Sequence, residues 1–174
     1  MKIERGEKEI SHIFKMIDSQ RQINLSPSAG QSFGRPKSVR KPLVLIVENH
    51  DDTRSMLKTI LEVWDYETAE AANGVEAVNV AAAVRPDLVL MDVTLPHKDG
   101  IDAMHDIHAL TALARVPVVL ISGHAQSDFR HNALALGGSD FLVKPVDLGQ
   151  LETALADNLA RSAARAARGK DTLW

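Results

Sequence analysis

The chain contains 174 residues, of which 45% are apolar, 25% charged and 4% aromatic, a length that suits one compact domain with extra terminal residues. This composition excludes a wholly disordered or collagen-like chain, and the absence of cysteine excludes disulfides and cysteine-bound zinc. The net charge of −3 hides an asymmetry, because residues 1–42 carry +5, residues 43–160 carry −11 and residues 161–174 carry +3. An acidic central part argues against nucleic-acid binding and favours either a divalent cation or a basic partner.

Residues 1–23 differ in pattern from the rest of the chain. Their apolar residues recur at helical spacing, which predicts an amphipathic helix, and residues 24–41 have the composition of a flexible linker. The helix must cover its apolar face against its own domain, a second copy or another protein. We predict a homodimer that depends on residues 1–23. The apolar residues are Ile10, Ile13, Phe14 and Ile17.

Residues 42–162 alternate short apolar runs rich in branched side chains with segments of helical apolar spacing. This alternation predicts a doubly wound α/β domain with a parallel sheet and right-handed crossovers. Helices are expected over Ala125–Leu136 and from Asp147, whose side chain would cap the last helix. Residues 163–174 would extend this helix and form a tail, with Gly169 ending the helix. The expected strands are Leu43–Val47, Tyr66–Ala71, Leu88–Met91, Val116–Ile121 and Asp140–Val143.

Polar residues follow the carboxyl ends of the predicted strands. In open α/β sheets, ligands bind at this edge of the sheet. Glu48 and Asn49 follow the first strand, Asp92 the third, Ser122 the fourth and Lys144 the fifth. Oxygen ligands at one edge suit Mg²⁺, and a lysine would stabilise charge on a transferred phosphoryl group. The residues therefore predict phosphoryl transfer to a carboxylate.

Four motifs in this order resemble the receiver domain of two-component response regulators, and in particular the stand-alone receivers of the chemotaxis type. The resemblance covers about residues 42–160. It implies a flavodoxin-like, five-stranded parallel sheet in the order 2-1-3-4-5. The motifs are Val47–Arg54, Pro86–Asp92 with Leu95-Pro96 and Asp99-Gly100, Pro117–Ser122 and Phe141–Pro145.

The resemblance also implies a phosphoacceptor and a metal site. Asp92 would accept a phosphoryl group from a histidine kinase or a histidine phosphotransfer protein. Glu48, Asn49, Asp92 and the backbone carbonyl of Thr94 would hold Mg²⁺. Position 49 departs from the family, which usually has Asp there, and we expect the lost charge to weaken magnesium binding.

Further roles follow from the same resemblance. Lys144 would contact the phosphoryl group, and the Lys144–Pro145 peptide would be cis. Ser122 would be the switch hydroxyl and Phe141 the switch aromatic residue. Thr94 and His124 stand where family members tune the lifetime of the phosphoryl group.

Other polar residues admit simpler interpretations. Asp51 and Asp52 follow the first strand closely, and we expect Asp52 to cap the helix that begins there. His105 and His108 share a helical face with Asp102, a spacing that could bind zinc but that we interpret as a solvated surface.

Three functions are compatible with these residues to different degrees. The first is a receiver that signals by protein contact or phosphorelay to an unknown downstream protein, with no enzymatic turnover beyond autodephosphorylation. The second is a phosphorylation-deficient receiver that acts as a scaffold or dimerisation module. The third, a Mg²⁺-dependent phosphatase, would need a second Asp where Thr94 stands. About a dozen residues follow residue 162, and we therefore expect no direct DNA binding.

The sequence also bears on location. No apolar run approaches the length of a transmembrane helix, and the acidic residues near the N-terminus do not resemble a secretory signal. We therefore expect a cytoplasmic protein with no membrane partner.

Overall fold

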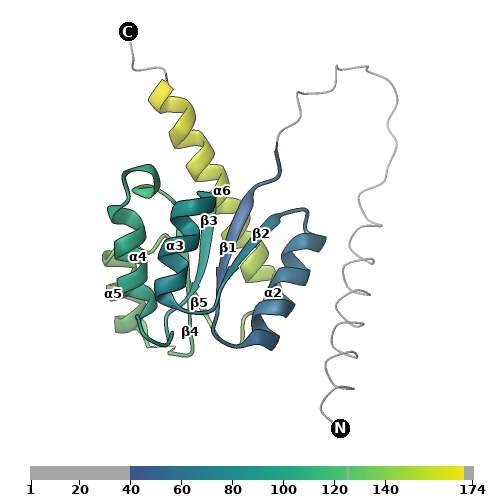
Figure 1. Cartoon of the computed structure of the whole chain (residues 1–174), viewed down its shortest axis with the longest axis vertical. Helices are drawn as coiled ribbons and strands as arrows, with labels where there is room; N and C mark the ends of the chain where they lie inside the picture. The colour runs from purple at the N-terminus through teal and green to yellow at the C-terminus, as the bar shows by residue number, and fades with distance from the viewer. Residues whose placement is uncertain (1–39, 125, 171–174) are drawn as a thin grey trace. The chain divides into compact units, whose positions relative to one another are not determined.

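The computed structural model describes residues 40–124 and 126–170 (Figure 1). The amphipathic helix and linker predicted for residues 1–41 lie almost wholly outside these ranges and stay predictions. None of the helices in the described ranges is long and apolar enough to cross a membrane. The elements are β1 (Leu43–Val47), α2 (Asp51–Val63), β2 (Glu67–Ala71), α3 (Gly74–Val84), β3 (Leu88–Asp92), α4 (Gly100–Ala109), the 3₁₀ turn η2 (Thr111–Leu113), β4 (Val118–Ser122), α5 (Ser127–Ala135), β5 (Asp140–Val143) and α6 (Leu148–Lys170).

The five strands form one parallel sheet in the order β2-β1-β3-β4-β5, which confirms the predicted topology. β1 and β5 have the predicted bounds. β3 and β4 extend to Asp92 and Ser122, so that these two polar residues end their strands rather than follow them. The order reverses between β1 and β3, and their carboxyl ends therefore frame the crevice in which such sheets bind ligands.

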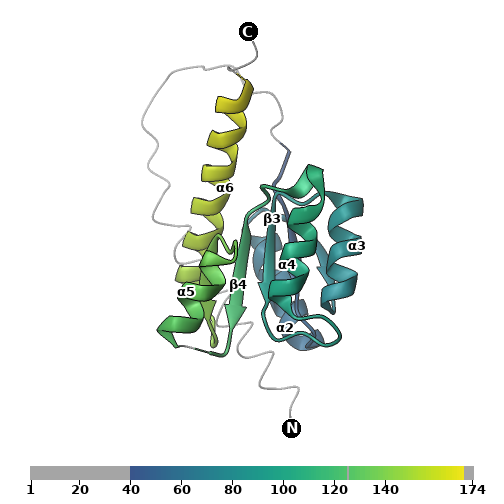
Figure 2. The same cartoon turned by 90° about the vertical axis from the view of Figure 1, so that its left-hand side faces the viewer.

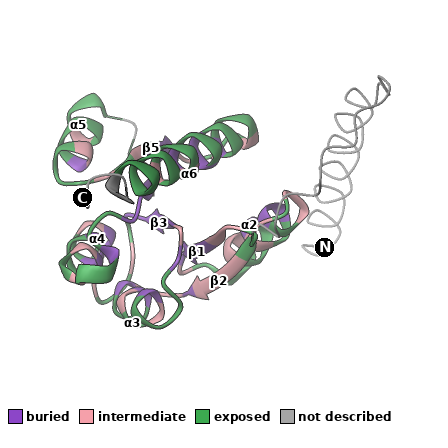
Figure 3. Cartoon of the chain, turned by 90° about the horizontal axis from the view of Figure 1, so that it is seen from above, coloured by how far each residue is buried: buried purple, intermediate pink, exposed green. Residues whose placement is uncertain are grey.

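Helices cover both faces of the sheet (Figure 2). One core cluster contains buried residues of α3, α4 and α5, and the other contains buried residues of α2 and α6. β3 and β4 are buried along their whole length, which explains their continuous apolar sequence. Figure 3 shows the buried strand β3 between α6 on one side and α3 and α4 on the other.

Two helix ends differ from the sequence predictions. Asp52 does not cap α2, because the helix already begins at Asp51 and both carboxylates lie in its first turn, where they interact favourably with the helix dipole. Gly169 does not end α6, which continues to Lys170 because the preceding alanines and arginines favour helix strongly. The predicted cap of α6 is confirmed, since Asp147 Oδ1 accepts a hydrogen bond from the Gln150 N–H at 2.9 Å.

Gly100 begins α4 at a point where the backbone of β3 passes very close. A β-carbon there would lie 2.2 Å from the Asp92 carbonyl oxygen and 2.9 Å from Val93 Cα. The Gly100 N–H also donates a hydrogen bond to the Val93 carbonyl at 2.9 Å. Glycine, which has no β-carbon, therefore allows α4 to begin in direct contact with the backbone at the end of β3.

We predict that Gly100→Ala lowers the free energy of unfolding by about 1–3 kcal/mol, the usual cost of overpacking. Without this clash, alanine in a helix would be stabilising. Gly123→Ala is the control, because a β-carbon at Gly123 has no neighbour within 4 Å. Urea unfolding followed by circular dichroism measures both variants. Equal stability of the two would contradict the close approach.

Candidate functional site

The polar residues predicted to converge do meet at the carboxyl edge of the sheet. Glu48 directly follows β1, Asp92 ends β3, Ser122 ends β4 and Lys144 directly follows β5. The parallel register brings these strand ends together, since Val47 pairs with Met91, Asp92 with Ile121 and Ser122 with Val143. Four segments far apart in the chain thus contribute one side chain each to the same edge.

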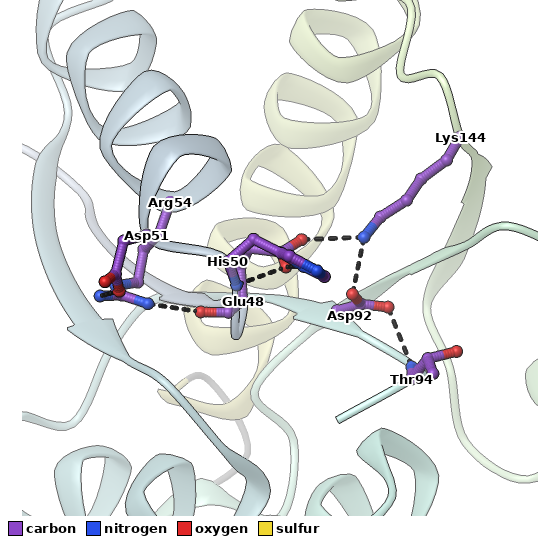
Figure 4. Close-up of polar contacts among 7 residues, drawn as sticks. All are labelled: Glu48, His50, Asp51, Arg54, Asp92, Thr94 and Lys144. Atoms are coloured by element: carbon purple, nitrogen blue, oxygen red, sulfur yellow. Dashed lines mark hydrogen bonds and ion pairs between the residues drawn. The ribbon is translucent and has the colours of Figure 1, made fainter. Parts of the chain in front are cut away.

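The centre of this site is an ammonium group between two carboxylates (Figure 4). Lys144 Nζ lies 2.6 Å from Asp92 Oδ2 and 2.8 Å from Glu48 Oε2. Asp92 is only 3% exposed and Glu48 only 2%. Buried carboxylates are costly unless they are paired and hydrogen-bonded. Lys144 provides the pairing for both of them.

Glu48 and Lys144 shift each other's pKa. Burial by itself raises the pKa of Glu48, but hydrogen bonds from Lys144 and from the His50 backbone and ring outweigh burial and hold this pKa below its usual value. Burial likewise lowers the pKa of Lys144, and its hydrogen bonds to Asp92 and Glu48 outweigh this effect and raise the pKa. The site is therefore ionised at neutral pH, with a lysine cation beside a glutamate anion.

Backbone and side-chain donors hold the carboxylates in place. The Thr94 N–H donates to Asp92 Oδ1 at 2.9 Å, so that each oxygen of Asp92 accepts one hydrogen bond. The His50 N–H donates to Glu48 Oε1 at 3.0 Å. Arg54 donates to the Glu48 carbonyl oxygen at 2.8 Å and also pairs with Asp51 (Figure 4). Arg54 closes the first motif, but its position in the sequence did not indicate these contacts.

Among the described residues, one buried side-chain oxygen or nitrogen atom lacks a hydrogen-bond partner. This atom is Oδ1 of Asn49. Among the described residues no group of three or more His, Asp and Glu side chains could hold a metal ion. The oxygen donors here are instead two carboxylates, Glu48 and Asp92, and the amide of Asn49. Such a set fits a hard cation such as Mg²⁺, with one charge fewer than three carboxylates would supply.

A chain of aromatic contacts leads away from Ser122. This residue is fully buried, and its Oγ accepts a hydrogen bond from the His124 N–H at 3.1 Å. The His124 ring lies 5.6 Å from the Phe129 ring, which lies 6.0 Å from the ring of Phe141. Phe141 is buried in the core, and the Lys144–Pro145 peptide is cis as expected. The sequence showed Phe129 only as an apolar residue on a predicted helix.

The histidine pair on α4 forms no metal cluster with Asp102 in the described part of the chain. His105 is exposed, as predicted for a solvated face. His108 is half-buried, and its Nε2 lies 2.9 Å from the Val116 carbonyl oxygen, which is a structural contact.

The chain is similar in sequence and in structure to known receiver domains. A family model described as the response regulator receiver domain matches residues 44–156. Chemotaxis protein CheY of Listeria monocytogenes is 37% identical over 113 residues, which cover 64% of this chain and 93% of CheY. The crystal structure of the receiver domain of sensor histidine kinase PA1611 from Pseudomonas aeruginosa has a magnesium ion coordinated in its active site cleft. It matches with a TM-score of 0.64 at 30% identity, over 69% of this chain and 98% of that domain.

A longer relative matches only in part. Regulatory protein AtoC of Escherichia coli is 37% identical over 108 residues, which make up 62% of this chain but only 23% of AtoC. The chain therefore spans about a quarter of the length of that relative.

We predict that the stabilising effect of Glu48 depends on pH. Because its pKa is lowered in the folded protein, Glu48 contributes stability above its unfolded pKa of about 4.5, and this contribution is lost as the pH falls through the folded value. Glu48→Gln should lower the free energy of unfolding by about 1–3 kcal/mol at pH 7, the cost of an unsatisfied buried partner. The difference from wild type should shrink below pH 4.5.

Urea unfolding at a series of pH values measures this difference. Glu152→Gln is the matched control, because Glu152 is exposed on α6. A Glu48→Gln penalty that stays constant from pH 7 to low pH would show that the carboxylate charge contributes nothing.

Proposed function

The chain belongs to the response regulator receiver domain family, and on this basis we propose that Asp92 accepts a phosphoryl group from a histidine kinase or a histidine phosphotransfer protein. The chain then signals by contact with a downstream protein or by phosphorelay. The contact between Asp92 and Lys144 is the observation that carries this proposal. A buried carboxylate at the end of β3 with an ammonium 2.6 Å away suits an acceptor whose product carries more negative charge.

The transfer uses groups that the chain already positions. An Asp92 carboxylate oxygen attacks the phosphorus atom, the bond from phosphorus to the donor's imidazole nitrogen breaks, and the imidazole leaves with the electron pair and takes a proton. Lys144 lies where it stabilises the added charge on the phosphoryl oxygens. Ser122 can donate its hydroxyl proton to one of them. The chain is thus an acceptor, with turnover limited to loss of its own phosphoryl group.

Magnesium fits the oxygen donors of the site. Glu48, Asn49, Asp92 and the backbone carbonyl of Thr94 would hold the ion, and the unpartnered Asn49 oxygen supports this assignment. The ion would neutralise negative charge where the phosphoryl group meets the carboxylate.

Two loops beside Asp92 are proposed to tune and transmit the signal. Thr94 follows Asp92 closely, and His124 Nδ1 lies 3.5 Å from Ser122 Oγ, so both residues stand where they can affect the approach of water to the phosphoryl group. The contacts of His124 with Phe129 and of Phe129 with Phe141 connect the loop after β4 to α5 and β5. Movement of Ser122 toward a phosphoryl group would therefore disturb these two elements.

No observation favours the alternative of a phosphorylation-deficient scaffold. Asn49 removes one charge, but Asp92, Ser122 and Lys144 are all present and in position. The homodimer expected from residues 1–23 lies outside the described residues and stays a prediction.

We predict that Asp92→Asn abolishes phosphorylation, because an amide oxygen cannot form the acyl phosphate. Transfer of radiolabelled phosphoryl groups from a panel of autophosphorylated histidine kinases measures this. Asp106→Asn is the matched control, since Asp106 is exposed on α4, and it should be labelled like wild type. Label that persists in Asp92→Asn would place the acceptor elsewhere.

We predict that Asn49→Asp tightens Mg²⁺ binding at least about fivefold, because one added charge next to the ion contributes on the order of 1–4 kcal/mol. Calorimetric titration with magnesium chloride measures the affinity. Asn132→Asp adds the same charge on the exposed side of α5 and should leave the affinity close to that of wild type. Equal effects of the two substitutions would mean that position 49 does not face the metal.

A further inference from the structure

A pocket lies at the edge of the sheet opposite the Asp92 site, near the amino-terminal ends of β4 and β5. It encloses about 310 Å³, a volume at the lower end of the range for small-ligand sites. Figure 2 shows that α6 continues past the start of β4, and the far half of α6 forms one wall of the pocket. The polar residues that line it include Arg115, Ser139, Asn158, Arg161, Ser162 and Arg165.

This pocket is basic although residues 43–160, which supply part of its lining, are acidic as a whole. Three arginines line it, no Asp or Glu does, and residues 43–160 carry a net charge of −11. Within the described ranges, none of the three arginines forms an ion pair with a carboxylate. The pocket therefore holds concentrated positive charge without an internal counter-ion from the described residues.

Two of the polar groups are already arranged by the fold. Asn158 is 2% exposed, its Nδ2 donates to the Ala154 carbonyl at 2.7 Å, and its Oδ1 accepts from Arg161 at 2.9 Å. The buried amide thus orients the Arg161 guanidinium. Ser139 Oγ accepts a hydrogen bond from the Val118 N–H at 3.3 Å, which leaves the hydroxyl proton for another acceptor.

The helix propensity of arginine suits α6, but repulsion between two arginines one turn apart opposes it. Arg161 and Arg165 are four residues apart on α6, and like charges at this spacing destabilise a helix. Both lie before the last turn of α6, outside the reach of the favourable helix dipole. They also lie beyond residue 156, where the match to the receiver family ends. The pocket is therefore partly built from residues that the family match does not include.

We propose that this pocket binds the phosphate group of a small phosphorylated molecule. A guanidinium presents paired N–H donors that match phosphate oxygens, and arginine is favoured wherever such recognition is needed. Three arginines and the Ser139 hydroxyl offer more donors than a single carboxylate accepts, whereas a phosphate offers three strong acceptor oxygens. A nucleic acid would need an extended basic surface, whereas these arginines line one pocket of a domain whose residues 43–160 carry a net charge of −11.

Calorimetric titration of the full chain in magnesium-free buffer tests this site with three probes: inorganic phosphate, AMP and adenosine. We expect both anions to bind and adenosine not to bind. Arg115→Gln and Arg165→Gln should each weaken binding about tenfold or more, the usual effect of losing a charge-assisted hydrogen bond. Arg130→Gln is the matched control, because it removes the same charge from α5 outside this pocket.

The outcomes separate the sources of the phosphate. Tighter binding of AMP than of inorganic phosphate identifies a phosphorylated organic ligand, and equal affinities identify the phosphate group alone as what is recognised. Absence of binding by both anions at millimolar concentration overturns the proposal, as does equal binding of AMP and adenosine. Equal weakening by Arg130→Gln and the pocket variants would show unspecific attraction and would also overturn it.

The variants are chosen to remain folded. The side chains of Arg115 and Arg165 are exposed and form no ion pair or hydrogen bond within the described residues, so their replacement removes no internal contact. Circular dichroism of each variant verifies this, and either variant alone suffices for the test.

Discussion

The position of Lys144 between two buried carboxylates is the interaction on which the rest of the site depends. Glu48 and Asp92 end or follow neighbouring central strands, and parallel register forces them together away from water. Two such carboxylates cost several kcal/mol each in lost hydration unless a cation compensates. Lys144 provides that cation from the loop after β5, an edge strand on the far side of β4. The site therefore forms only when the strands of the sheet pair in the correct order and register.

The same arrangement makes the site responsive to charge. A phosphoryl group on Asp92, as proposed, would give Lys144 a new anionic partner and compete with its contact to Glu48. Ser122 is buried beside them, and the contacts that run from His124 through Phe129 reach α5 and β5. The basic pocket lies at the other edge of the sheet and shares no lining residue with this site. The two edges thus offer the domain separate places for a covalent and a non-covalent phosphate.

Much of the fold could be predicted from sequence because β3 and β4 are buried on both faces and need long apolar runs. Polar residues at the ends of such runs could be recognised as a site, and for Asp92 and Lys144 the structure brings the side chains into contact. The ends of the helices were harder to predict from the sequence. Whether Asp52 caps α2 or lies inside it depends on a difference of one residue in where the helix begins. The basic pocket could not be predicted, because Arg115 and Arg161 are far apart in the chain and each alone resembles a solvated surface residue. The unpartnered oxygen of Asn49 likewise depends on three-dimensional packing.

Chemical mapping of the phosphorylated chain shows directly whether Asp92 carries the phosphoryl group, as proposed. Borohydride reduces an aspartyl phosphate to homoserine, and tandem mass spectrometry of the digested protein then locates the modified residue. We expect homoserine at position 92 after incubation with a phosphorylated kinase, and unmodified Asp at Asp51, Asp52 and Asp99. Homoserine at any of those positions, with Asp92 intact, would contradict the proposal.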